Sequence, residues 1–189
     1  MLTSKSDCLG YPETLPTADQ EIYAGRVVTL RLKRLPQPDG TTRVREIVEH
    51  APRAAVVAVD RDGQVLLVRQ PRPAVDTYLL ELPAGLVDPG EQPIDTARRE
   101  LEEETGFTSQ RLEPLVRFYT SPGFSTELLH IFVATTLEAC RVDPDEDEEI
   151  ELVRMPLGQA IDQVLTGELS DAKTVAGLLA YWRRTVSTP

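Results

Sequence analysis

The sequence predicts an α/β (α+β) fold in which helices cover both faces of a mixed β-sheet, an α/β/α sandwich, with a further antiparallel sheet at the N-terminus. Three observations favour this fold. Short apolar runs typical of strands recur along the chain, interspersed with segments of helical character. Two strand-like segments precede the apolar core segments. A chain of 189 residues can bury a single hydrophobic core without help from disulfides.

The first 49 residues are expected to form an N-terminal arm followed by strands. Residues 1–20 are polar and rich in proline, which is typical of a partly ordered arm. Apolar side chains tend to alternate in residues 22–35, which indicates a strand. Residues 36–40 contain prolines, aspartate and glycine and predict a turn, after which residues 42–49 return as a second strand.

Residues 50–189 are expected to form the main domain. Apolar or extended runs predict its strands at residues 54–59, 65–68, 78–82, 112–119, 128–136 and 150–154. The sequence Arg-Asp-Gly at residues 61–63 predicts the hairpin turn between the first two of these strands. Two of the three expected helices come last in the chain, at residues 157–165 and 170–184.

The remaining helix is the best defined element of the sequence. Pro93 suits its first turn, where the missing N–H costs nothing, and Gly106 suits the position just past its end. Between them, Ile94, Ala97 and Leu101 recur at helical spacing. We expect these three side chains to form the buried stripe of the helix.

Three glutamates of this helix, Glu100, Glu103 and Glu104, share a face well away from the apolar stripe. Carboxylates this close repel one another unless a cation lies between them. Mg²⁺ takes oxygen ligands and commonly bridges to substrate phosphates. Glu91, at the other end of the preceding loop, is placed to fold back onto the same cluster. The pattern therefore predicts a metal site for a phosphate ester or anhydride.

A solvated acidic surface is the alternative, because strings such as residues 99–104 are common in ordinary helices. The full spacing favours the metal site, since a helix surface gives no reason for a fixed glycine and glutamate upstream. That spacing runs G-x5-E-x7-R-E-L-x-E-E-x-G-F from Gly85 to Phe107. The segment resembles the Nudix box, the signature of hydrolases that split nucleoside diphosphates linked to another group, and it matches every position of that signature.

The resemblance implies a Nudix-type sandwich and a set of metal ligands. Mg²⁺, for which Mn²⁺ or another divalent ion can substitute, would be held by the Ala84 carbonyl with Glu100, Glu104 and also Glu103. The ions would neutralise the diphosphate and lower the pKa of a bound water. Arg99 is expected to hold the glutamates in place, and Glu91 to support the loop, rather than to touch substrate.

The segment from Ser121 to Glu127 narrows the choice within the family. Its proline follows the box by about fifteen residues, which is similar to the ADP-ribose-hydrolysing branch. The longer proline- and tryptophan-rich string of NADH hydrolases is absent. Gly123 would let a backbone approach the ligand closely, and Glu127 would bond sugar hydroxyls. A plain surface loop is the alternative for this segment.

The acidic run at residues 143–149 is by composition a solvated loop. In ADP-ribose pyrophosphatases a similarly placed loop carries a glutamate that moves over the bound substrate to activate or orient water. Alignment on Ile150 makes Glu146 the first candidate and Glu148 the second. If the catalytic base lies elsewhere, Glu103 becomes the better candidate.

Three further residues resemble family positions that bind substrate. Arg72 follows a strand and is similar to an arginine that meets the diphosphate or the terminal ribose phosphate, although a surface arginine is the alternative. Arg45 and Glu46 resemble residues that border adenine, sometimes across a dimer interface. His50 and His130 lie in or beside strands without partners at a ligand spacing, and we interpret both as structural.

The expected activity is Mg²⁺-dependent hydrolysis of ADP-ribose to AMP and ribose 5-phosphate. Two alternatives stay open: hydrolysis of another nucleotide sugar, of the GDP-mannose or UDP-sugar type, and a non-catalytic ADP-ribose sensor on the same fold. Retention of all box carboxylates argues against the sensor. The strands in residues 22–49 resemble a sheet that family members exchange within a homodimer.

Composition limits the partners and the compartment. A formal charge of −11 disfavours nucleic acid polymers, whose binding depends on clustered Lys and Arg. No apolar run approaches the roughly 18 residues of a membrane span, and the N-terminus does not resemble a signal peptide. The two cysteines, Cys8 and Cys140, have no partners at metal-ligand spacing. We therefore expect a cytoplasmic protein that binds neither membranes nor nucleic acid.

Overall fold

The computed structural model describes residues 18–141 and 149–186. Contacts between Cα atoms divide the chain into two compact units, Met1–Glu49 and His50–Pro189. No helix of the described residues is long and apolar enough to cross a membrane.

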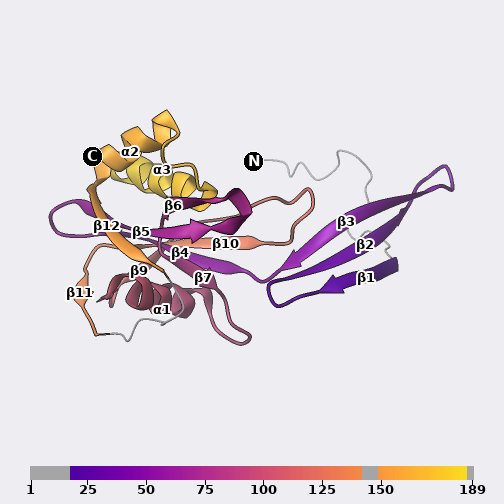
Figure 1. Ribbon diagram of the computed structural model, residues 1–189, viewed down its shortest axis with the longest axis horizontal. Helices are drawn as coiled ribbons and strands as arrows, with labels where there is room; N and C mark the ends of the chain where they lie inside the picture. The colour runs from indigo at the N-terminus through magenta and orange to yellow at the C-terminus, as the bar shows by residue number, and fades with distance from the viewer. Residues whose placement is uncertain (1–17, 142–148, 187–189) are drawn as a thin grey trace, which may run out of the picture. The chain divides into compact units, whose positions relative to one another are not determined.

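The N-terminal unit is a three-stranded sheet in the order β1-β2-β3 (Figure 1). Its strands are β1 (Ala18–Ala24), β2 (Val28–Pro36) and β3 (Thr42–His50), and β1 pairs with β2 in antiparallel orientation. The additional N-terminal sheet is therefore confirmed, but the single strand expected at residues 22–35 is wrong. A turn closed by the Gly25 N–H and the Val28 carbonyl, 2.9 Å apart, splits it into two strands.

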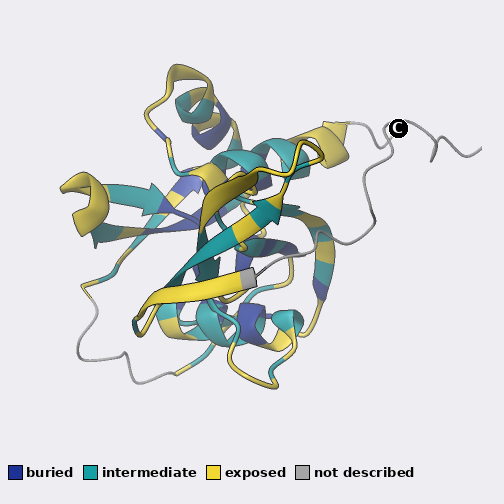
Figure 2. Ribbon diagram, turned by 90° about the vertical axis from the view of Figure 1, so that its right-hand side faces the viewer, coloured by how far each residue is buried: buried dark blue, intermediate teal, exposed yellow. Residues whose placement is uncertain are grey.

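The side chains of this small sheet are poorly covered. No residue between Asp19 and Glu49 is fully buried, and four apolar side chains are exposed (Figure 2). These are Ile22, Tyr23, Val27 and Val44. A sheet with so little buried surface gains little stability of its own.

The main unit contains a seven-stranded sheet in the order β12-β5-β4-β10-β9, with β6 paired to β5 and β7 to β4. Strand β10 runs parallel to β4 and the other pairs are antiparallel, so the predicted mixed sheet is confirmed. The strands of this sheet are β4 (Arg53–Val59), β5 (Gln64–Arg72), β6 (Thr77–Glu81), β7 (Ala84–Leu86), β9 (Leu112–Tyr119), β10 (Leu128–Ala134) and β12 (Glu151–Pro156).

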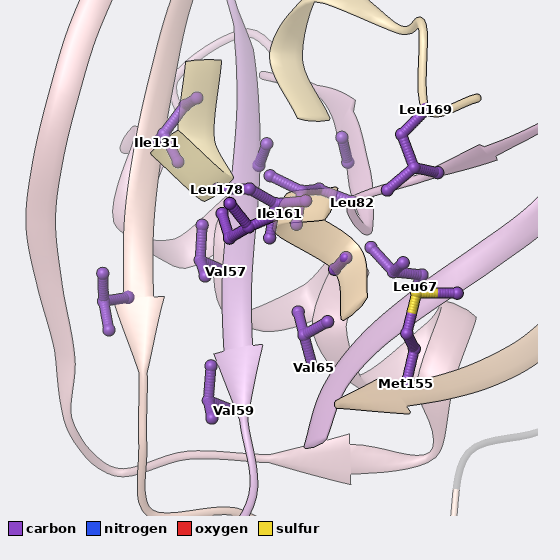
Figure 3. Close-up of a cluster of buried hydrophobic side chains, with 14 of the residues drawn as sticks. Val57, Val59, Val65, Leu67, Leu82, Ile131, Met155, Ile161, Leu169 and Leu178 are labelled. Carbon is purple, nitrogen blue, oxygen red and sulfur yellow. The ribbon is translucent and has the colours of Figure 1, made fainter. Parts of the chain in front are cut away.

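Helix α1 (Pro93–Thr105) covers one face of the sheet, and α2 (Leu157–Thr166) and α3 (Ala172–Val186) cover the other (Figure 1). Ala97 and Leu101 of α1 are buried against the even-numbered side chains of β4 and Leu66 of β5. The odd-numbered side chains of β4 and β5 pack with α2 and α3 through residues such as Ile161 and Leu178 (Figure 3). The two clusters are the two sides of one α/β/α sandwich.

Local sequence signals missed the elements that are short or polar. Strand β5 extends four residues beyond its expected end, through Arg69, Gln70 and Pro71, which lack an apolar pattern. Pro71 is tolerated there although it has no N–H to donate. Four further short elements had no detectable signal: β7, the 3₁₀ helix η1 (Pro73–Val75), and the paired strands β8 (Phe107–Thr108) and β11 (Glu138–Ala139).

Candidate active site

The candidate site is built around the segment that joins β6 to β7, residues 81–85, here called the β6–β7 turn. The Leu82 N–H donates to Thr174 Oγ1 of α3 at 2.9 Å, and the Pro83 carbonyl accepts from the Val56 N–H of β4 at 3.0 Å. Beyond the proline, Ala84 and Gly85 pair with β4. The backbone of this turn is therefore held by α3 on one face of the sheet and by β4 within the sheet.

Helix α1 presents two of its glutamates to this turn. Glu104 Oε2 accepts a hydrogen bond from the Ala84 N–H at 2.9 Å. Glu100, one helical turn earlier, lies so close to Gly85 that a Cβ added there would be 1.8 Å from its Oε1 atom. The position of Gly85 thus leaves room for a carboxylate that any larger residue would displace.

Arg99 connects the carboxylates of the loop and the helix. Its Nη1 donates to Glu100 at 2.6 Å and to Glu103 at 3.0 Å, while Nε and Nη2 each reach Glu91 at 3.2 Å. Nη2 also donates to the Leu86 carbonyl at 3.3 Å. The hydrogen bond with Glu91, followed by the charge of Glu100, raises the pKa of Arg99 above its ordinary value. All three guanidinium nitrogens of Arg99 therefore donate hydrogen bonds to neighbouring protein groups.

Glu91 is held as firmly from the loop side. Its Oε2 accepts from Thr96 Oγ1 at 2.7 Å and from the Asp88 N–H at 3.2 Å, in addition to its contacts with Arg99. Hydrogen bonds from Arg99 and then Thr96 lower the pKa of Glu91 from 4.5 to about 2. These contacts fasten the loop to the first two turns of α1.

The lowered pKa of Glu91 predicts a pH dependence of stability. A carboxyl whose pKa is lower in the folded state stabilises that state above its unfolded value, here 4.5, and this contribution is lost as the pH falls towards about 2. We expect Glu91→Gln to flatten the fall in Tm across this window. Glu138→Gln, at an exposed site on β11, controls for the change in net charge. Equal slopes in wild type and Glu91→Gln would contradict the assignment.

The donor set fits a hard divalent cation, although the carboxylates do not converge in this structure. Among the described residues, no three His, Cys, Asp or Glu side chains are gathered closely enough to hold a metal ion. Glu100 and Glu103 bind Arg99 instead, and the Glu103 side chain is 43% exposed. Even so, Glu100 and Glu104 reach the same backbone segment, and carboxylate and carbonyl oxygens are the ligands that Mg²⁺ prefers.

Arg72, at the end of β5, is bound by a glutamate that the sequence analysis gave no role. Its Nε and Nη2 donate to Glu81 Oε1 and Oε2, both at 2.7 Å. Lys173 of α3 also contacts Glu81 Oε2 and lies 3.1 Å from Asp171. The Glu81 side chain is only 1% exposed, and burial alone would raise its pKa. The hydrogen bonds and charges of Arg72 and Lys173 outweigh that effect and lower the pKa of Glu81.

Arg72 also lies within electrostatic reach of α1. The hydrogen bond with Glu81 raises its pKa most, and the charges of Asp171 and Glu104 add to the effect. The sequence signal that could have indicated a role for Glu81 is its charge within the otherwise apolar run at residues 78–82. Lys173, 92 positions away, gave none. Arg72 therefore lies beside Glu81 at the start of the β6–β7 turn, and Glu104 binds Ala84 further along the same turn.

The segment from Ser121 to Glu127 is joined by its hydrogen bonds to the start of the main unit. Glu127 Oε2 accepts from Thr120 Oγ1 at 2.6 Å, and Oε1 lies 3.5 Å from His50 Nδ1. Thr126 Oγ1 bonds both the N–H and the carbonyl of His50. A Cβ added to Gly123 would meet nothing within 4 Å, so protein packing does not require glycine there.

The remaining expected site residues belong to the acidic run and to β3. Glu146 and Glu148 lie outside the described residues. The last residue of the acidic run, Glu149, accepts a hydrogen bond from the Tyr78 hydroxyl at 2.9 Å. Arg45 and Glu46 are exposed on β3 of the N-terminal unit. Burial and the charge of Arg117 lower the pKa of His130 on β10, which has no role in the expected chemistry.

This chain is similar in sequence and in fold to known proteins. ADP-ribose pyrophosphatase of Bacillus subtilis is 40% identical over 159 residues, covering 83% of this chain and 86% of the relative. GDP-mannose pyrophosphatase of Cronobacter sakazakii is 40% identical over 141 residues, covering 69% and 73%. A crystal structure of an ADP compounds hydrolase superimposes with a TM-score of 0.79 at 27% identity, covering 94% of this chain and 98% of the other.

The match to a family gives the assignment directly. The family described as the NUDIX domain matches residues 49–178, which include the β6–β7 turn, α1 and the Arg72–Glu81 pair. The relatives above match over most of their own lengths as well as most of this chain. The chain therefore belongs to the Nudix family.

Proposed function

We propose that this protein hydrolyses the diphosphate of ADP-ribose to AMP and ribose 5-phosphate in a Mg²⁺-dependent reaction. The observation that carries the proposal is the approach of Glu100 and Glu104 to Ala84 and Gly85, in the same turn whose Glu81 binds Arg72. Carboxylates and a carbonyl supply oxygen ligands at one side of the site, and a guanidinium supplies hydrogen-bond donors for phosphate. The ADP-ribose pyrophosphatase of B. subtilis supports the choice of substrate.

Glu100, Glu104, the Ala84 carbonyl and also Glu103 would hold the metal ions. Bound there, divalent ions supply charge neutralisation for the diphosphate and a lowered pKa for water. Mn²⁺ or another divalent ion would substitute, because the ligand chemistry is the same. Arg99 keeps the carboxylates in position through the hydrogen bonds described above.

The reaction also needs a group that accepts the proton of the attacking water. We assign this role to Glu146, with Glu148 as the alternative, and to Glu103 if both of these fail. Since attack by water requires no covalent protein intermediate, no serine or cysteine nucleophile is needed. Separate Glu146→Gln and Glu148→Gln variants distinguish the three candidates by which one loses turnover.

The rest of the substrate would be bound by side chains from several loops. Arg72 would contact the diphosphate, Glu127 the ribose hydroxyls, and Gly123 would let the backbone approach the ligand. Arg45 and Glu46 would border the adenine. In Glu127 one oxygen is already occupied by Thr120, so the other, near His50, is the one available to a sugar hydroxyl.

The nucleotide sugar specificity is tested by a substrate panel. We expect kcat/KM to be highest for ADP-ribose among ADP-ribose, GDP-mannose and UDP-glucose, each measured at saturating Mg²⁺. The GDP-mannose pyrophosphatase relative makes GDP-mannose the second candidate. A higher kcat/KM for GDP-mannose than for ADP-ribose would make GDP-mannose the preferred substrate. Tight ADP-ribose binding without turnover would favour the non-catalytic sensor.

We further propose a cytoplasmic homodimer that forms through the N-terminal unit. The support is physical: four exposed apolar side chains lie on or beside the strands of that unit, and exposed strand edges favour pairing with another chain. Light scattering is expected to give twice the monomer mass of 21.0 kDa at micromolar concentration. A monomer, or full activity after deletion of residues 1–49, would contradict the proposal.

A further inference from the structure

The side-chain nitrogen of Gln70 on β5 is a buried hydrogen-bond donor without a partner among residues 18–141 and 149–186. Among the described residues only two buried side-chain atoms have no hydrogen-bond partner, Gln70 Nε2 and Arg53 Nε. An amide donor without an acceptor in a buried position costs free energy, so such atoms are uncommon in folded proteins. Such a donor is satisfied either by ordered water or, at a binding site, by an acceptor of the ligand.

The direction of the Gln70 side chain follows from the regular pairing of β5. Its register with β6 is unbroken from Val68 to Arg72, so alternate side chains share one face of the sheet. Leu66, on that face, packs against α1. Gln70 therefore lies on the α1 face between Leu66 and Arg72. Arg53 lies on the opposite face, because it shares a face of β4 with Ala55, two residues along, and Ala55 packs with α2 and α3.

Arg72, the next side chain on this face, is only partly available to a ligand. Glu81 occupies its Nε and one hydrogen of Nη2, leaving Nη1 as the nitrogen best placed to bind phosphate. A diphosphate presents several charged oxygens, more than one guanidinium nitrogen can satisfy. A second donor beside Arg72 would complete the contact. Gln70, two residues away on the same face, supplies such a donor.

We propose that Gln70 is a substrate-contact residue whose Nε2 group donates a hydrogen bond to a diphosphate oxygen of the nucleotide substrate, beside Arg72. This inference rests on the proposed hydrolysis of a nucleoside diphosphate derivative. It gives a role to an amide nitrogen that is buried without a partner, although the Gln70 residue itself is only partly buried. The contact is made to the diphosphate, which every substrate of the panel shares.

The test uses Gln70→Met, which keeps the length of the side chain and removes the donor. We expect kcat/KM for ADP-ribose to fall about ten- to a hundredfold, the usual effect of removing a hydrogen bond to a charged group. The Tm of the substrate-free protein should stay the same or rise, since the variant removes an unsatisfied buried donor. If the Gln70 side chain were instead needed for folding, Gln70→Met would lower the Tm.

Gln64→Met is the matched control. Gln64 lies on the same face of the same strand, six positions away, which is about 20 Å along a strand. It has no place in the proposed site, so its kcat/KM should equal that of the wild type. Comparing the two single variants separates the loss of the Gln70 contact from a general effect of placing methionine in β5.

Measuring ADP-ribose and GDP-mannose side by side separates this inference from the proposed function. We expect Gln70→Met to lower kcat/KM by the same factor for both, because the diphosphate is their common part. A wild-type protein inactive on both would overturn the proposed function and this inference with it. If the wild type is active, three results for Gln70→Met would overturn this inference and leave the proposed function intact. These are a normal kcat/KM, a loss of activity together with a fall in Tm, and a loss of activity on only one of the two substrates.

Discussion

Glu100→Gln and Glu104→Gln are each expected to lower kcat by about a thousandfold or more at saturating Mg²⁺. Each substitution removes the charge of a carboxylate that we propose as a metal ligand, between α1 and the β6–β7 turn. Glutamine keeps the shape of the side chain and can still accept the hydrogen bond that Glu104 receives from the Ala84 N–H. The Tm of both variants should therefore stay close to that of the wild type.

Glu102→Gln is the matched control for this pair. Glu102 is on the same helix and loses the same charge, but its carboxylate binds Thr108 rather than the β6–β7 turn. Glutamine can still accept that hydrogen bond, so Glu102→Gln should keep near-normal kcat and Tm. Near-normal rates in both Glu100→Gln and Glu104→Gln would show that the metal site has been assigned to the wrong residues.

Gly85→Ala is expected to cost nearly as much activity, through sterics rather than charge. The added Cβ would lie 1.8 Å from Glu100 Oε1 and 2.1 Å from its Cδ, so the carboxylate must move. The backbone has little freedom to yield, because Gly85 pairs with Ala54 in the sheet. We expect kcat to fall by at least a hundredfold with a smaller effect on Tm, because the clashing atoms are the end of the Glu100 side chain and not backbone.

Two further variants separate this clash from other effects of alanine. A Cβ added to Gly158, at the start of α2, would meet nothing within 4 Å, so Gly158→Ala should keep wild-type kcat. In a Glu100→Ala background, Gly85→Ala should cause little further loss of activity or stability, because the displaced carboxylate is already gone. Additive losses in that double variant would place the effect of Gly85→Ala elsewhere.

The elements that the sequence predicted well have strong local signals. Proline at the first position and glycine just past the end define α1, and Gly106 adopts the left-handed conformation, with φ of 71°, that this role requires. Ala97 and Leu101 are buried as the apolar stripe predicts. The spacing of the box also places Glu91 and Arg99 in contact, although eight positions separate them.

The parts that could not be predicted depend on contacts distant in the sequence. Nothing near Gln70 or Lys173 indicates that the first lacks a partner or that the second neutralises Glu81, since both facts arise only when β5, β6 and α3 meet. The short strand β7 has no pattern of its own and exists because β4 pairs with it. The break between β1 and β2 was missed although Gly25 and Arg26 interrupt the apolar pattern there, because the apolar residues on either side were read as one alternating strand.

Identification of the products of ADP-ribose tests the proposed chemistry most directly. Purified full-length protein incubated with ADP-ribose and Mg²⁺ should yield AMP and ribose 5-phosphate in equal amounts, and neither product when EDTA removes the metal. Glu100→Gln should lose the products in the same assay. Release of ADP and free ribose, turnover that persists in EDTA, or no cleavage of ADP-ribose by an intact, folded wild type would contradict metal-dependent cleavage of the diphosphate.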